Sequence, residues 1–248
     1  MIAGLTVAIA GLVVGRGTVV MIHGAGGGGW EYDFWKPQFT HAGYKVVAPD
    51  LTPSGGGLAK TTYADYEAQV IGWAKTAKRP LIVVGASMGG ALAQSTAKDL
   101  KPDAMVLVDS VAPKGVGERR ASQDIPEIVR WANGPIQDTR DAMPDSDEKT
   151  IQWAWKKWRD ESGAVMRTLT EGIKAAAPDC PVLTVWGEND TDIPVETGVA
   201  IAKVYHADMK VYSKTSHVGP LLGTRSQEIA SDVLRWIESA QKPDPNHS

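Results

Sequence analysis

The chain has 248 residues, of which 22% are charged, and this length is enough for one large domain with a well-buried core. Its 26 basic and 29 acidic residues are well mixed and give a formal net charge of −3, so no basic stripe indicates a nucleic-acid partner. Cys180 is the only cysteine, which excludes an intrachain disulfide and a cysteine-based zinc site.

The first fourteen residues carry no charge, and two interpretations compete for them. They resemble the apolar part of an export signal, but the positive segment of such a signal is missing, because the first charged residue is Arg16. The stretch is also too short to span a bilayer comfortably. We therefore expect residues 1–15 to form a β-hairpin that turns near Gly11 and Gly15, in a cytoplasmic protein without stable membrane insertion.

Short apolar runs, typical of strands buried on both faces of a parallel sheet, recur along the chain. They occupy residues 18–22, 44–48, 81–84, 104–108, 181–186 and 209–212. Helix-like segments lie between or after them, at about 34–42, 63–78, 88–100, 195–205 and 221–240. This alternation predicts an α/β fold with a mostly parallel, doubly wound sheet.

One segment, residues 113–177, interrupts the alternation. It contains no convincing strand, several prolines and tryptophans at positions 131, 153, 155 and 158. An insertion of this length is too long for an ordinary connection and usually acts as a lid or binding element. We therefore predict a helical cap at 113–177, inserted into a core formed by 1–112 and 178–248. The alternative is a peripheral pair of helices that only packs on the core.

A candidate nucleophile follows the third strand-like run. Residues 85–89 have the pattern G-x-S-x-G, with Ser87 at its centre, and stand directly between a strand-like and a helix-like segment. In that context the serine occupies a sharp, strained turn that exposes its hydroxyl at the top of the sheet. An ordinary glycine-rich loop is the alternative, so the interpretation depends on finding a base and an acid.

Two later loops supply candidates for that base and acid. His217 lies in the loop after the last strand-like run, and Asp190 lies in the loop after the preceding run. Loops at the carboxyl ends of strands surround the ligand crevice of open α/β sheets. The order Ser87, Asp190, His217 is also the order in which the α/β-hydrolase fold delivers its catalytic triad. A structural histidine and a solvated acidic turn are the alternatives.

With these residues the chain resembles the α/β-hydrolase superfamily over about residues 18–240. The acid loop of that family reads roughly G-x-x-D-x-x-x-P, and the resemblance therefore places the acid at Asp190, with Pro194 at the matching proline. Asp192 is the second choice. Asp109 is the third, because some family members take their acid from the end of that strand.

The resemblance also implies an oxyanion hole. One donor is the backbone N–H of Met88, the residue after the nucleophile. The other is the backbone N–H of Ala25, in the glycine-rich loop that begins His23-Gly24-Ala25. By the same resemblance, His23 is structural and supports the loop.

Within the superfamily, this glycine-rich loop and Trp30 are similar to the group of plant methylesterases and hydroxynitrile lyases, and to small bacterial esterases. The resemblance implies a compact cap over a mostly apolar pocket, with no cofactor and no metal. Hydroxynitrile lyases of the group have a lysine after the catalytic histidine, where this chain has Val218, so cyanohydrin cleavage loses support. We therefore predict a serine esterase that cleaves small carboxylic esters, with substrate contacts from Gly24, Trp30, Trp131 and Trp153.

Other functions remain open at this point. The glycine-rich loop contains Gly24, Gly26 and Gly29 at dinucleotide-binding spacing, and Asp50 follows the next strand, as in an NAD(P)-dependent oxidoreductase. That hypothesis is weaker, because the run of glycines makes the match nearly automatic and leaves the predicted triad unexplained. A hydrolase-like ligand receptor, a perhydrolase and a carbon–carbon bond hydrolase are all compatible with the same triad. The sequence determines neither the substrate nor the oligomeric state.

Overall fold

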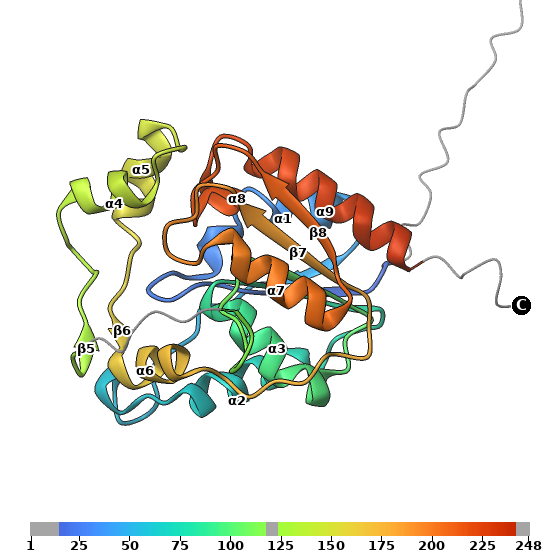
Figure 1. Ribbon diagram of the computed structural model, residues 1–248, viewed down its shortest axis with the longest axis horizontal. Helices are drawn as coiled ribbons and strands as arrows, with labels where there is room; N and C mark the ends of the chain where they lie inside the picture. Colours follow the sequence, from blue (N-terminus) through green and yellow to red (C-terminus); the bar gives the residue numbers. More distant parts are fainter. Residues whose placement is uncertain (1–14, 118–123, 242–248) are drawn as a thin grey trace, which may run out of the picture.

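A six-stranded parallel sheet forms the centre of the computed structural model, which describes residues 15–117 and 124–241 (Figure 1). The strands are β1 (Thr18–Ile22), β2 (Lys45–Val47), β3 (Leu81–Ala86), β4 (Ala104–Val108), β7 (Val182–Gly187) and β8 (Asp208–Tyr212). Their order is β2-β1-β3-β4-β7-β8, and every neighbouring pair is parallel. The predicted α/β fold with a mostly parallel, doubly wound sheet is confirmed.

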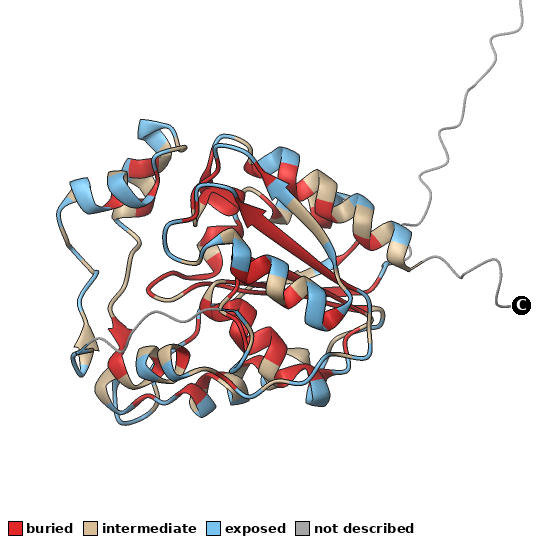
Figure 2. Cartoon of the chain, viewed as in Figure 1, coloured by how far each residue is buried: buried red, intermediate tan, exposed pale blue. Residues whose placement is uncertain are grey.

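Helices cover both faces of this sheet, so that its central strands are buried on both sides (Figure 2). Alternate residues of β1 divide between the two faces: Val19 and Met21 belong to one apolar cluster, and Val20 and Ile22 belong to the other. The first face is covered by α1 (Lys36–His41), α8 (Gly219–Leu222) and α9 (Ser226–Ala240), and the second by α2 (Tyr63–Ala74), α3 (Met88–Leu100) and α7 (Val195–Tyr205).

The segment between β4 and β7 lies at one end of the molecule (Figure 1). It contains the helices α4 (Ile136–Ala142), α5 (Glu148–Trp155) and α6 (Gly163–Glu171). It also contains a short antiparallel pair, β5 (Ile128–Val129) and β6 (Glu161–Ser162), so the expectation of no strand here was wrong. Two-residue strands are too short to show any alternation in the sequence. The division into a core and a cap with bounds 113–177 stays a prediction.

Some helices differ from their predicted extent. The single helix expected at 221–240 is interrupted after α8, where the Thr224 N–H donates to the Asp145 carbonyl at 3.0 Å and so cannot join a continuous helix. Two short 3-10 helices, η1 (Gly29–Tyr32) and η2 (Leu58–Lys60), precede α1 and α2. The expected hairpin at 1–15 falls almost entirely on residues 1–14, outside the described residues. Among the helices of residues 15–117 and 124–241, none combines the length and apolar character that crossing a bilayer requires.

The turn from β3 into α3 brings backbone atoms so close together that only glycine fits. A Cβ atom on Gly85 would lie 2.2 Å from the Gly89 carbonyl oxygen. A Cβ atom on Gly89 would lie 2.0 Å from the Ile22 carbonyl oxygen at the end of β1. The two outer glycines of the G-x-S-x-G pattern are therefore required by packing between α3 and the sheet.

Gly89→Ala is expected to lower the free energy of unfolding by about 1–3 kcal/mol or more, because the backbone of β1 cannot move away from the new methyl group. The matched control is Gly72→Ala within α2, where the new methyl group would point into open space, since no atom lies within 4 Å of the Cβ position. The control should gain roughly 0.5–1 kcal/mol from helix propensity. Urea unfolding monitored by tryptophan fluorescence measures both values, and equal stability of the two variants would contradict the packing argument.

Candidate active site

Ser87 occupies the strained position that the sequence predicts. Its φ is +51° and its ψ −115°, and it stands between the end of β3 and the first turn of α3. Its N–H donates to the Val108 carbonyl at 2.9 Å, and its carbonyl accepts from Gly90 at 3.1 Å. The backbone of Ser87 is thus fixed from both sides, while its side chain lines a cavity at the carboxyl edge of the sheet.

His217 and Asp190 form a hydrogen-bonded pair in the same region. The distance from His217 Nδ1 to Asp190 Oδ2 is 2.7 Å. The other carboxylate oxygen of Asp190 accepts the backbone N–H groups of Asp192 and Ile193, each at 2.8 Å. Because an ionised carboxylate can only accept, Nδ1 is the donor and Nε2 is the nitrogen that can act as a base.

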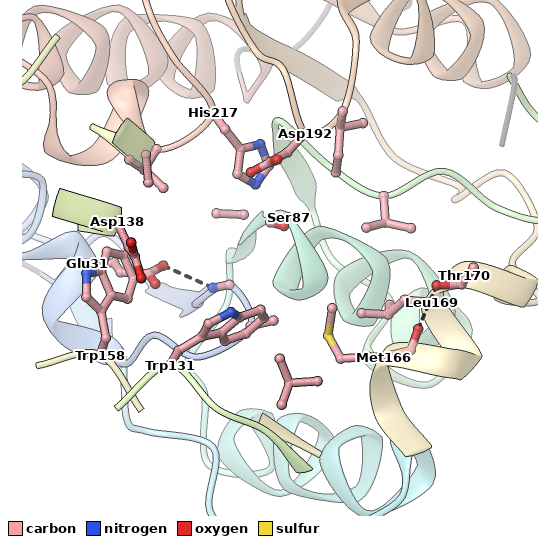
Figure 3. Close-up of a pocket in the computed structure, with 18 of the residues that line it drawn as sticks. Glu31, Ser87, Trp131, Asp138, Trp158, Met166, Leu169, Thr170, Asp192 and His217 are labelled. Carbon is pink, nitrogen blue, oxygen red and sulfur yellow. Dashed lines mark hydrogen bonds between the residues drawn. The ribbon is translucent and has the colours of Figure 1, made fainter. Parts of the chain in front are cut away.

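The predicted base and nucleophile face one another across the cavity. Figure 3 shows the His217 ring beside the Ser87 hydroxyl, and both residues line the cavity. Within the described part of the chain, however, no hydrogen bond joins the Ser87 hydroxyl to the His217 ring. Such contacts are often long in free enzymes and shorten when substrate binds.

The Asp190 carboxylate controls the protonation of His217. Burial alone would lower the pKa of this imidazole, but the hydrogen bond and the negative charge of Asp190 raise the pKa to about 9. The buried carboxylate thus favours the imidazolium. Nε2 can take a proton only from the unprotonated ring, whose share rises as the pH approaches and passes about 9.

Asp109, the third candidate for the acid, is in a different environment. It is 1% exposed, and its Oδ1 accepts the Gly187 N–H at 2.8 Å. Its Oδ2 has no hydrogen-bond partner among the described residues, and burial raises the pKa of this carboxyl well above its ordinary value. Among the described residues no hydrogen bond joins Asp109 to His217, so Asp109 does not orient the ring as Asp190 does.

Asp109, Asp190 and His217 also form a group that could hold a metal ion, because their ligand atoms lie within 4.8 Å of one another. A cation there would have to displace the hydrogen bond from His217 to Asp190. It would also compete with the two backbone N–H groups that already bind Asp190. The donor set therefore fits a hydrogen-bonded pair of His217 and Asp190 better than a metal centre.

The glycine-rich loop after β1 leaves one N–H group available beside Ser87. The N–H groups of Gly24, Gly26 and Gly29 donate to carboxylates, those of Glu31 (3.0 Å), Glu161 (3.1 Å) and Asp50 (2.8 Å) respectively. The N–H of Ala25 has no partner among the described residues, and Ala25 lines the cavity. Met88 is the first residue of α3, so its N–H has no intrahelical acceptor. These two groups are the expected oxyanion donors.

His23 is buried beneath this loop with both ring nitrogens engaged. Nδ1 lies 2.8 Å from the Gly24 carbonyl, and Nε2 accepts the Leu51 N–H at 2.9 Å. Burial lowers the pKa of His23 to about 4. A neutral ring held by two backbone groups supports the loop and is not available as a base.

The glycines of the loop are explained by packing within this chain. A Cβ atom on Gly27 would lie 1.5 Å from Glu31 Oε1, and a Cβ atom on Gly29 would lie 1.8 Å from the Ala48 carbonyl oxygen. Asp50, the residue expected to bind a ribose, instead accepts the Gly29 N–H. The loop glycines and Asp50 therefore no longer support the dinucleotide hypothesis.

The cavity has a volume of about 790 Å³ and lies between the sheet and the inserted segment. Of the predicted substrate contacts, Gly24 and Trp131 line it. Trp30 and Trp153 are not among its lining residues, and substrate contacts from these two stay a prediction. They stack edge to face, with ring centroids 5.2 Å apart, and join the inserted segment to the core.

Sequence reasoning missed other residues of the cavity. Trp155 and Trp158 line it, although nothing in their spacing distinguishes them from Trp153. Glu31 also lines it, and burial raises the pKa of this carboxyl to about 7, while the Gly24 N–H partly opposes the shift. In the sequence, Glu31 is a single acidic residue after Trp30, and nothing in that pattern predicts a buried carboxyl group in the cavity.

The environment of His217 can be tested by NMR titration of the imidazole. In the wild type its pKa is expected near 9, above the ordinary value of 6.5. In Asp190→Asn the pKa should fall, because the substitution removes the negative charge and weakens the hydrogen bond. His23 serves as the internal control, since it should stay neutral above about pH 5 in both proteins. A His217 pKa that is the same in both proteins would contradict the role given to Asp190.

Comparisons with known proteins show the family and the fold of this chain. A family model described as the alpha/beta hydrolase family matches residues 19–232. An uncharacterized hydrolase from Bacillus subtilis (strain 168) is 27% identical in an alignment 251 positions long, which includes 89% of this chain and 89% of the other.

Solved structures give the same result for the fold. A pyrethroid hydrolase from Sphingobium faniae JZ-2 superposes with a TM-score of 0.70 at 21% identity, over 90% of this chain and 97% of the other. A methylesterase from Arabidopsis superposes with a TM-score of 0.68 at 14% identity, over 90% of this chain and 99% of the other.

Proposed function

Because the chain belongs to the alpha/beta hydrolase family, we propose that it is a serine hydrolase that cleaves small carboxylic esters through an acyl-enzyme. One observation supports this proposal above all. The strained Ser87, the His217 ring with its Nδ1 bonded to Asp190, and Ala25 with its unpartnered N–H all belong to the same cavity. A nucleophile, an oriented base and an oxyanion donor are the parts that acyl transfer requires.

In the first step, His217 Nε2 takes the proton of the Ser87 hydroxyl as Oγ attacks the carbonyl carbon of the ester. The carbonyl oxygen becomes an oxyanion that accepts hydrogen bonds from the N–H groups of Ala25 and Met88. The tetrahedral intermediate then collapses. The imidazolium gives its proton to the leaving alcohol, and the acyl group remains on Ser87.

In the second step, a water molecule replaces the alcohol. His217 takes a proton from the water, whose oxygen attacks the acyl carbon, and the same two N–H groups stabilise the second oxyanion. His217 then returns the proton to Ser87 Oγ as the carboxylic acid leaves. Asp190 accepts the Nδ1–H hydrogen bond throughout and keeps the imidazole ring oriented.

The cavity favours an ester with an apolar, bulky part. Its lining from the inserted segment includes three tryptophans and the apolar side chains of α6, namely Trp131, Trp155, Trp158, Met166 and Leu169. Aromatic walls of this kind bind flat or branched apolar groups through area burial and ring stacking. The names of the two structural neighbours, a pyrethroid hydrolase and a methylesterase, also favour hydrolysis of an ester. The proposed chemistry uses no metal and no cofactor.

Ser87→Ala is expected to lower kcat for p-nitrophenyl butyrate by roughly 10⁴-fold or more, because no other group can form the acyl-enzyme. The midpoint of urea unfolding should change little, since the Ser87 side chain makes no cap hydrogen bond to α3. Ser95→Ala, in the same helix, is the matched control and should keep wild-type kcat. Ser87→Ala with wild-type activity would contradict the proposed nucleophile.

A panel of p-nitrophenyl and alkyl esters that differ in acyl length and alcohol size tests the substrate class. We expect kcat/KM to rise with apolar size until the ester fills the cavity. A fluorophosphonate should label Ser87 in the wild type and not in Ser87→Ala. Tight binding of an ester without turnover, together with no labelling, would instead indicate a ligand receptor.

A further inference from the structure

We propose that Arg159 and Glu161, from the segment inserted between β4 and β7, are positioning residues for the oxyanion loop. They hold residues 24–29 so that the Ala25 N–H points at the reacting carbonyl oxygen. This inference rests on the proposed function, because it assigns a purpose to groups that never touch the acyl carbon. It also gives the inserted segment a part in the chemical step, beyond covering the substrate.

Arg159 binds the loop through both its backbone and its side chain. Its backbone N–H donates to the Gly26 carbonyl at 2.7 Å, and its Nε donates to the Gly27 carbonyl at 2.7 Å. Its Nη1 donates to the Leu51 carbonyl at 3.2 Å and lies 3.5 Å from Asp50 Oδ2. Two consecutive carbonyl groups of the loop are thus held by one residue.

Glu161 binds the same loop from the other side of Gly26. The residue is 3% exposed, and its Oε2 accepts the Gly26 N–H at 3.1 Å. Its Oε1 accepts both the Tyr66 hydroxyl and the Ser162 N–H at 2.8 Å. Because Tyr66 belongs to α2, this carboxylate connects the loop to a helix of the core. The carboxylate cannot move without breaking one of these bonds.

The contacts of Glu161 and those of the buried His23 together fix the peptide planes on the two sides of Ala25. In a planar trans peptide, C=O and N–H point in opposite directions. The Gly24 carbonyl faces the buried His23 ring, which therefore directs the Ala25 N–H away from that ring. The next peptide plane, between Ala25 and Gly26, ends in the Gly26 N–H, which donates a hydrogen bond to Glu161 Oε2. One plane is thus fixed by the core and the other by the inserted segment.

Such restraint is needed because the loop is built of consecutive glycines. Gly26 has a φ of +68°, and residues 26–29 are all glycine, so the free loop has access to many backbone conformations. An oxyanion donor lowers the barrier only if it is already aimed at the oxygen when charge develops. Glycines have no side chains with which to restrain the loop, so the polar contacts of Arg159 and Glu161 restrain its backbone instead.

The same segment also carries a wall of the cavity. Asp160 Oδ1 accepts the backbone N–H groups of Trp131 and Ala132, each at 3.0 Å. The Trp131 ring packs directly on Gly26, where a Cβ atom would lie 2.3 Å from Cε3. Figure 3 shows this ring in the cavity. Substrate contact and oxyanion geometry therefore depend on one short stretch of chain.

The test compares Arg159→Ala and Glu161→Gln with the wild type. We expect kcat for p-nitrophenyl butyrate to fall roughly 10- to 100-fold, less than the 10²- to 10³-fold loss of a whole donor, with KM changed less than about 3-fold. Inhibition by a trifluoromethyl ketone, which adds to the serine as an oxyanion, should weaken by the same factor as kcat. The corresponding methyl ketone should bind as before, and added guanidinium should restore part of the activity of Arg159→Ala.

Arg140→Ala and Glu148→Gln are the matched controls. These two exposed residues pair with each other in the same inserted segment, and both variants should keep wild-type kcat. Arg159→Lys, which keeps the charge but not the forked geometry, provides a second variant if Arg159→Ala does not fold, and should also lose kcat. Equal weakening of both ketones would indicate collapse of the whole site and would overturn the proposal, as would unchanged kcat in Arg159→Lys and Glu161→Gln.

Labelling of wild-type Ser87 by a fluorophosphonate separates this inference from the function on which it rests. If Ser87 is labelled and essential but the Arg159 and Glu161 variants keep their kcat, only the positioning role is wrong. If Ser87 is neither labelled nor needed for turnover, the serine hydrolase proposal itself fails.

Discussion

The close approach of α3 to the end of β1 is the constraint on which the rest of the site depends. Gly89 packs against the Ile22 carbonyl with no room for a side chain, because the two strands β1 and β3 are neighbours in the sheet. This contact places the Ser87 turn beside the loop that follows β1, so a Cβ atom on Gly24 would lie only 3.5 Å from that of Ser87. The doubly wound topology reverses direction between these strands, and ligand crevices open at such points. Nucleophile and oxyanion loop are therefore brought together by the path of the chain.

The distribution of charge follows from what each carboxyl can bind. Asp190 receives an imidazole N–H and two backbone N–H groups. Asp109 and Glu31 lie as deep but accept one backbone N–H each, and burial raises the pKa of both. The carboxylate that orients His217 thus has three N–H donors. Negative charge is reduced at Glu31, which lines the cavity, and a weaker negative charge there favours the formation of an oxyanion.

Local patterns in the sequence predicted the sheet, because strands buried on both faces are continuous apolar runs. The pairing of Asp190 with His217 also followed from the sequence, since parallel strands end at one edge and bring their loops together. The positions of the tryptophans did not follow from the sequence. Trp155 and Trp158 line the cavity, whereas the half-buried Trp153 packs against Trp30, and only the packing of the inserted segment on the core distinguishes them. Arg159 and Glu161 gave no signal, because their partners are carbonyl and N–H groups of a distant loop, which any sequence provides.

The bond between Gly26 and Glu161 joins residues that are 135 positions apart in the chain. Contacts of such long sequence separation form late, because the intervening chain must first be ordered. During synthesis, the loop after β1 emerges well before the segment that holds it, and β7 and β8, whose following loops carry Asp190 and His217, emerge later still. A partly made or partly folded chain would therefore have its serine in place without an ordered oxyanion loop. The proposed ester hydrolysis would then report the completed fold, with little reactivity before the last strands have joined the sheet.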